Sequence, residues 1–203
     1  MNDSVPTRRR PVVLWFLLFI ATLVAMGIVV KATDIGGTIY GKAMMLASLP
    51  FLIKAGLNAA ANAQSSGSRG TPQASYLRRM LAVSLLYLGS LFAAVALIDD
   101  GDPITPISAL LALMPGIAVA GYFWAVGRFL VEIKDEFLRM LQIRAALFAT
   151  GISLSAASIW GFLENFGQVP HVDAFWWPII WFFGLGLGSL WNKLTYGTTG
   201  ECP

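Results

Sequence analysis

Apolar runs of about twenty residues recur along this chain, separated by short stretches that hold most of its charged residues. An α-helix of that length crosses the roughly 30 Å hydrocarbon core of a bilayer, and it satisfies its own backbone hydrogen bonds there. Only 12% of the 203 residues are charged, whereas a soluble domain has about 25% charged residues. The sequence therefore predicts an all-α fold, a polytopic transmembrane helix bundle.

Six membrane spans are expected, and the second is the weakest because it contains Pro50 and Lys54. Basic residues favour the cytoplasmic ends of membrane helices. If the second segment crosses, the arginines at positions 8–10 fall on the same side as Arg78 and Arg79, so this rule favours a crossing. Both termini are then expected in the cytoplasm. The expected spans are residues 12–30, 43–62, 80–98, 104–127, 140–163 and 175–191.

The segments between these spans are short and leave no room for a separate extramembrane domain. We expect a single integral membrane domain over residues 1–203, with a flexible cytoplasmic loop at 64–79 and a charged, helical cytoplasmic connection at 128–139. The apolar run that follows the N-terminal arginines is longer than the core of a signal peptide, so an uncleaved anchor is expected. These features exclude a built-in nucleotide-binding or nucleic-acid-binding domain.

Residues that could carry chemistry are scarce. Cys202 is the only cysteine and His171 the only histidine, which excludes an intrachain disulfide and a cysteine-based metal cluster. A metal site needs three or four ligands, and His171 has only Asp173 close to it in the sequence. We expect no catalytic residue, no metal and no cofactor. The expected partners are membrane lipids and other membrane protein subunits or a second copy of the chain, and not nucleic acid.

Three ionisable residues lie in or beside the expected spans and are candidates for transport: Lys54, Arg144 and Glu164. A charge in lipid costs several kcal/mol unless it is paired or its side chain reaches the headgroups. Lys54 and Arg144 are close enough to the cytoplasmic ends of their spans to reach the headgroups. Glu164 is expected at the outer interface. The bilayer midplane is therefore expected to lack a relay of ionisable groups.

The most regular polar pattern is formed by Arg128, Glu132, Asp135 and Arg139, which are spaced by four, three and four residues. On a continuous helix this spacing places all four on one face, where opposite charges can pair. One interpretation is a solvated helix end whose charges pair with one another. The alternative is a docking face for a partner protein.

Small residues at helical spacing are the clearest packing signals. Ala112, Gly116 and Ala120 form such a stripe in the fourth expected span, and Gly184 and Gly188 form a GxxxG pattern in the sixth. Helices in lipid associate mainly by close backbone approach through small residues. We therefore expect these five positions to pack helices together.

Part of the chain resembles a set of small bacterial inner-membrane proteins. The resemblance covers residues 76–191, and it implies a four-helix unit with a polar cytoplasmic hairpin in a bacterial inner membrane. Met140 departs from the pattern, which has an arginine there, and the two N-terminal spans have no counterpart. The resembling motifs are Tyr76-Leu77-Arg78-Arg79, Asp135-Glu136-Phe137-Leu138-Arg139-Met140-Leu141-Gln142, Gly161-Phe162-Leu163-Glu164 and Trp177-Pro178.

Three classes of function remain open. The favoured one is an accessory or structural subunit that packs in a larger membrane assembly, because the loops are short and packing signals outnumber chemical ones. The alternative is a small transporter or channel. The third is a lipid-modifying enzyme that uses Glu164, Asp173 and His171 at the outer interface.

Overall fold

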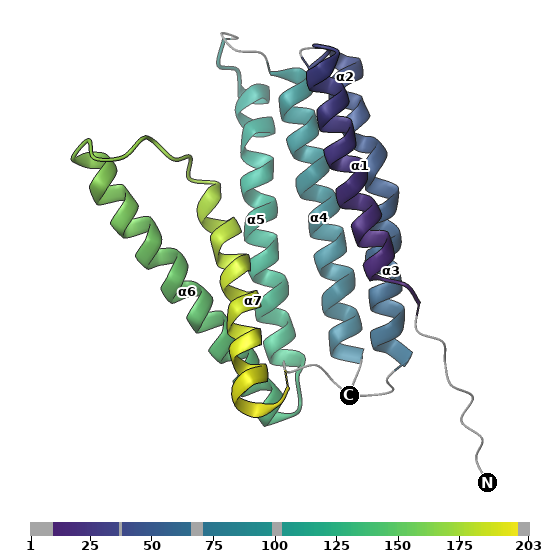
Figure 1. The fold of residues 1–203 in the computed structure, drawn as a ribbon, viewed down its shortest axis with the longest axis vertical. Helices are drawn as coiled ribbons and strands as arrows, with labels where there is room; N and C mark the ends of the chain where they lie inside the picture. The colour runs from purple at the N-terminus through teal and green to yellow at the C-terminus, as the bar shows by residue number, and fades with distance from the viewer. Residues whose placement is uncertain (1–9, 37, 66–70, 99–102, 199–203) are drawn as a thin grey trace. The chain divides into compact units, whose positions relative to one another are not determined.

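The described part of the chain is all-α in a computed structural model, which covers residues 10–36, 38–65, 71–98 and 103–198 (Figure 1). The chain consists of two compact units, an N-terminal unit, Met1–Phe129, and a C-terminal unit, Leu130–Pro203. The helices are α1 (Val13–Ala32), α2 (Ile39–Met44), the 3₁₀ helix η1 (Met45–Ser48), α3 (Leu49–Ser65), α4 (Thr71–Leu97), α5 (Pro106–Glu132), α6 (Glu136–Asn165) and α7 (Trp176–Tyr196).

Four described helices are long and apolar enough to cross a membrane: α1, α4, α5 and α6. They correspond to the first, third, fourth and fifth expected spans. The second and sixth expected spans correspond to α3 and α7. α3 has 17 residues and includes Lys54 and two asparagines, whereas α7 is rich in Trp and Gly, which lowers its mean hydropathy.

The second expected span is not a single regular helix, because Pro50 interrupts its hydrogen bonds. Proline has no N–H, so residue 50 cannot bond the carbonyl of Leu46 as an α-helix requires. The N–H of Leu49 bonds that carbonyl instead, which closes the tighter 3₁₀ turn of η1 before α3 begins.

The expected loop at 64–79 is wrong in most of its length. α3 extends to Ser65, residues 66–70 lie outside the described residues, and α4 already begins at Thr71. Pro72 favours this start, because proline suits the first turn of a helix. The next turn is held by Tyr76, whose ring stacks on Phe129 of α5 with 4.6 Å between centroids.

Helices of the N-terminal unit pack in chain order. α1 contacts α3 and α3 contacts α4, and these helices run side by side in Figure 1. α5 contacts α4 through side chains: the hydroxyl of Tyr122 donates to the hydroxyl of Ser84 at 3.0 Å, and a Cβ at Gly121 would lie 3.2 Å from Val83. Polar and small residues thus join the two longest helices of this unit.

Two asparagines four residues apart on α3 hold the segment that leads into α1. The amide of Asn62 both donates to and accepts from the backbone of Arg10, each bond at 2.9 Å. Asn58 is buried and donates to the carbonyl of Pro11 at 3.1 Å. These bonds satisfy backbone groups just before the first turn of α1, and they place the start of α1 beside the end of α3.

The C-terminal unit is a hairpin of α6 and α7. α6 ends in a Schellman motif: Gly167 has φ +70°, its N–H bonds the carbonyl of Glu164 at 2.9 Å, and the N–H of Gln168 bonds the carbonyl of Leu163 at 2.8 Å. A positive φ is strained for residues with a side chain, which explains the glycine. The chain then returns as α7 along α6.

Candidate functional site

Helices α6 and α7 pack against each other along one row of buried residues on each helix. Every fourth residue of α6 is buried there, and so is a matching row of α7 that includes two glycines. The buried residues are Leu141, Ala145, Ala149 and Ser153 on α6, and Trp181, Gly184, Gly188 and Asn192 on α7.

Gly184 and Gly188 bring the two helix backbones into direct contact. A Cβ at Gly184 would lie 2.7 Å from the Cα of Ala149, and one at Gly188 would lie 2.8 Å from the Cα of Ala145. No real Cβ tolerates such distances, and backbone atoms cannot move aside. The GxxxG pattern of the sequence therefore lies against the alanines of α6, as close packing in lipid requires.

Polar side chains within the hairpin bond across the interface. Each of three bonds joins one helix to the other, and one of them uses a side chain at each end. None of the buried side-chain N or O atoms in the described residues lacks a hydrogen-bond partner. The bonds are Ser153 Oγ to the carbonyl of Trp177 at 2.9 Å, Trp181 Nε1 to Thr150 Oγ1 at 3.0 Å, and Asn192 Nδ2 to the carbonyl of Leu141 at 2.8 Å.

Arg144, a transport candidate, contacts the end of α7. Its guanidinium donates to the hydroxyl of Tyr196 and lies 5.1 Å from the centre of that ring. The ring of Phe137 meets Tyr196 edge-on at 5.9 Å. A hydrogen bond and a cation–π contact on one ring anchor the guanidinium at the end of the hairpin.

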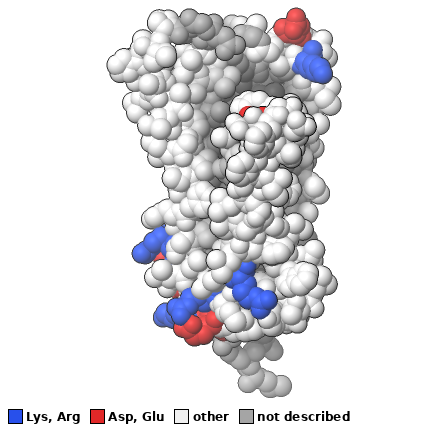
Figure 2. Space-filling view, turned by 90° about the vertical axis from the view of Figure 1, so that its left-hand side faces the viewer, with Lys and Arg blue, Asp and Glu red and all other residues white. Residues whose placement is uncertain are grey.

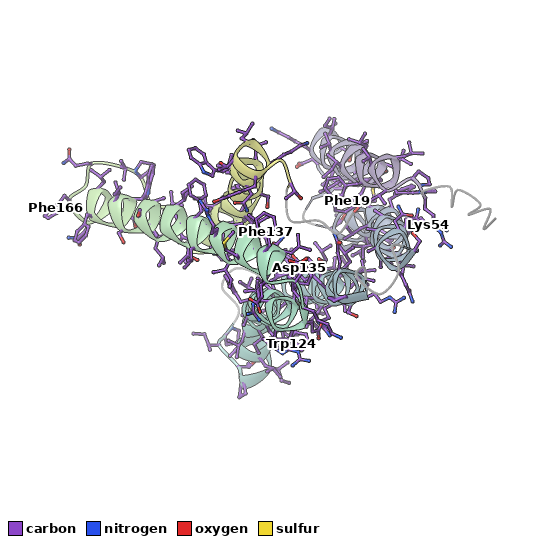
Figure 3. The ribbon with its side chains drawn as sticks, turned by 90° about the horizontal axis from the view of Figure 1, so that it is seen from below. Phe19, Lys54, Trp124, Asp135, Phe137 and Phe166 are labelled. Carbon is purple, nitrogen blue, oxygen red and sulfur yellow. The ribbon has the colours of Figure 1, made fainter. Side chains whose placement is uncertain are left out.

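The charged stretch does not form one helical face, so that part of the sequence interpretation is wrong. α5 ends at Glu132, residues 133–135 are not helical, and α6 begins at Glu136. Asp135 is the N-cap of α6 and accepts from the N–H groups of Phe137 and Leu138 at 2.9 and 3.1 Å (Figure 3). An aspartate cap competes with helix continuation because it satisfies the first free N–H groups.

Arg139 consequently pairs with a residue that the spacing did not indicate. Its guanidinium donates to both carboxylate oxygens of Glu136, at 2.7 and 2.5 Å. Arg128 lies on α5, and Glu132 is the last residue of that helix. The docking role of these residues stays a prediction, but without the shared face on which it rested.

At the opposite end of the hairpin, His171 lies between two carboxylates. Its Nδ1 is 2.6 Å from Oε1 of Glu164, and its Nε2 is 3.6 Å from Oδ1 of Asp173. The hydrogen bond with Glu164 raises the pKa of His171, and the charges of Glu164 and Asp173 act in the same direction. Within the described residues, no group of three or more His, Cys, Asp and Glu side chains is arranged to hold a metal ion.

This arrangement favours a protonated imidazole. With a carboxylate facing each ring nitrogen, both nitrogens are placed to carry a proton. An imidazolium has no lone pair with which to accept a proton from a substrate. The geometry therefore favours an ion cluster that ties the connecting loop to the end of α6 over the general base that a lipid-modifying enzyme would need.

The small-residue stripe of α5 lies on a different face from the one that packs. Ala112, Gly116 and Ala120 are exposed, and no atom comes within 4 Å of a Cβ placed at Gly116. Ala118 and Ala125 are buried instead. Sequence spacing identified a stripe but could not say which of two adjacent stripes faces α4.

Lys54 lies on the outside of α3 with an exposed side chain (Figure 3). Of the three transport candidates, Arg144 and Glu164 have partners within the hairpin, and Lys54 belongs to the other unit. The structure therefore does not bring the three together within either unit.

Together, these helices define the class: an all-α chain with four helices long and apolar enough to cross a membrane. No family model, curated protein or solved structure matches the chain.

Proposed function

We propose that this chain is an accessory or structural subunit of a larger membrane assembly. It spans a bacterial inner membrane six times and keeps both termini in the cytoplasm. The observation that carries the proposal is that polar side chains in the hairpin form hydrogen bonds from one helix to the other. Ser153, Trp181 and Asn192 bond the facing helix, so they act as links between helices and offer no open pathway to a solute.

Helix lengths support two spans beyond the four apolar ones. α7 has 21 residues, which at 1.5 Å per residue gives about 31 Å, close to the thickness of the hydrocarbon core. η1 and α3 have 4 and 17 residues, which gives roughly 33 Å when 3₁₀ geometry is used for η1. Both segments are therefore long enough to cross a bilayer.

The charges of the N-terminal unit support the orientation. Asn62 holds Arg10 beside the end of α3, and Arg78 donates to Gln64 at 2.8 Å, so both arginines lie at the same end of the unit, here named the basic end. Lys31 in the last turn of α1 and Asp34 just beyond that helix lie at the opposite end. A basic end on the cytoplasmic side follows the positive-inside rule.

The hairpin shows the same separation within its own unit. Lys134, Arg139 and Lys193 lie at or near the start of α6 and the end of α7. Glu164 and Asp173 lie at the other end with His171. Most of the described surface seen in Figure 2 is uncharged, which suits helices surrounded by lipid.

The exposed stripe on α5 supports lateral assembly. Ala112, Gly116 and Ala120 present little side-chain bulk, and close approach of another helix needs such a surface. The proposed partners are other membrane subunits or a second copy.

Purification of the full chain in mild detergent, followed by mass spectrometry of the intact complex, tests the proposal. We expect a stoichiometric partner subunit that Gly116→Leu removes. Gly127→Leu is the matched control, because Gly127 is also an exposed glycine of α5 with nothing within 4 Å of its Cβ position. Recovery of the monomer alone would contradict the proposal, as would equal loss of the partner in both variants.

Single cysteines placed in a Cys202→Ser background test the topology with a membrane-impermeant maleimide on intact cells. If α3 crosses, Lys31→Cys reacts and Arg78→Cys does not. If α7 crosses, Asp173→Cys reacts and Lys193→Cys does not. Equal labelling within either pair would remove the corresponding span.

A further inference from the structure

A cavity of about 360 Å³ lies within the N-terminal unit, between α1, α2, η1, the first residue of α3 and α4. On α1 it is lined by Phe19, Leu23 and Val30, and on α4 by residues that include Leu88 and Val95. The hydroxyl of Ser48 is the main polar group of a lining otherwise made of apolar side chains and two glycines. An apolar lining of this size suits a hydrocarbon ligand.

The length and depth of the cavity match one leaflet of a bilayer. From Phe19 to Val30 the lining follows α1 for about 16 Å, at 1.5 Å per residue. Half of the hydrocarbon core is about 15 Å. Val30 is two residues from the end of α1, so the cavity begins at the membrane surface opposite the basic end and reaches the midplane.

A cation follows the cavity lining by one residue on α1. Lys31 directly follows Val30, its side chain is exposed, and it forms no ion pair among the described residues. Gly36, just beyond the end of α1, lines the cavity, and a Cβ there would lie 3.5 Å from Val30. The segment from residue 31 to 42 holds Lys31 and Lys42 against Asp34, so the local charge is positive.

We propose that this cavity binds an acyl chain of an anionic membrane phospholipid whose phosphate pairs with Lys31. The apolar lining takes the hydrocarbon chain, the one-leaflet depth matches its length, and the exposed ammonium group of Lys31, next to the lining residue Val30, meets the headgroup. A cation near the surface attracts anionic lipid, and this attraction selects among headgroups that share the same chain. The site is independent of the proposed accessory function.

Photolabelling in vesicles tests the site. The full chain is reconstituted in phosphatidylcholine vesicles that contain a trace of phosphatidylglycerol with a photoreactive diazirine on its acyl chain. We expect labels to concentrate on peptides that contain residues 19–30 and 88–95. Photoreactive phosphatidylcholine should label these peptides about fivefold less, the effect of one lysine at the surface. Equal labelling by the two lipids would overturn the role of Lys31.

Two pairs of variants make the test specific. Leu23→Trp fills the cavity and should remove most of the label, whereas Val24→Trp changes an adjacent residue that is 55% exposed and does not line it. Lys31→Glu should abolish the preference for phosphatidylglycerol, and Lys31→Arg should keep it. Circular dichroism confirms that each variant is folded. Undiminished labelling of a folded Leu23→Trp protein would overturn the proposal, as would labels spread evenly along α1.

Discussion

Asn192 on α7 donates a hydrogen bond of 2.8 Å from its side-chain amide to the backbone carbonyl of Leu141 on α6, and both residues are buried. That carbonyl lies inside a regular helix, so the amide adds a second bond to it. A buried asparagine has few alternative partners, because its amide is shielded from water by the packed helices. The pair therefore fixes the register of the hairpin near the start of α6.

Replacing this amide by a hydrocarbon of similar size should weaken the hairpin. Interhelical hydrogen bonds in membranes contribute about 0.6 kcal/mol on average and at most about 1.7. We expect Asn192→Leu to lower the free energy of unfolding by about 1 kcal/mol in mixed detergent micelles. Asn165→Leu changes an exposed asparagine of the same unit and is the control. An unchanged free energy of unfolding in Asn192→Leu would show that the hydrogen bond to Leu141 does not stabilise the hairpin.

A methyl group at either interface glycine should separate the helices. Gly184→Ala and Gly188→Ala place a Cβ within 3 Å of the backbone of α6, and overpacking of this kind costs about 1–3 kcal/mol. Gly186→Ala has open space and should raise stability by up to about 1 kcal/mol through helix propensity. Unfolding in mixed micelles measures the free energy of unfolding, which should fall in the first two variants and rise in Gly186→Ala. The same sign in all three variants would contradict the packing.

The N-cap at Asp135 should tolerate asparagine but not alanine. Asn and Asp cap helices equally well, whereas alanine costs about 1 kcal/mol. We expect amide exchange of Phe137 and Leu138 to rise in Asp135→Ala and to stay near wild type in Asp135→Asn. If the charge of Asp135 mattered through ion pairs instead, asparagine would be as harmful as alanine.

The ion cluster of Glu164, His171 and Asp173, at the end of α6, should shift the titration of His171, which is the only histidine of the chain. Its pKa is raised in the folded protein, so the cluster stabilises the fold at pH values below the ordinary histidine pKa of about 6.5, as long as Glu164 stays ionised. This contribution is lost as the pH rises through the folded pKa. NMR of the single labelled imidazole measures that value directly.

Two variants, each of which replaces one carboxylate by a neutral amide, measure how much Glu164 and Asp173 each raise the pKa of His171. Glu164→Gln should lower the pKa of His171 more than Asp173→Asn does, because Glu164 is at 2.6 Å and Asp173 at 3.6 Å. Equal titration curves for the wild type and Glu164→Gln would show that the contact does not form in solution.

Local patterns in the sequence were enough to predict the long apolar helices. α1, α4, α5 and α6 lie where apolar runs of sufficient length occur, because a helix in lipid depends on its own residues for its hydrogen bonds. The break before α6 also had a local signal that we misread. Asp135 followed by Glu136 is typical of a helix start, but the spacing of charges suggested continuity.

The pairing of the helices and the choice of the packed face were decided by contacts between residues far apart in the chain. Asn58 and Asn62 carry no pattern that indicates the backbone of residues 10 and 11 as their partner, and nothing local tells Ala118 from Ala120 as the packed residue of α5. Helix periodicity determines which residues share a face. Which face is covered depends on the neighbour, because packing in lipid rewards close fit between two particular surfaces and not apolar character alone.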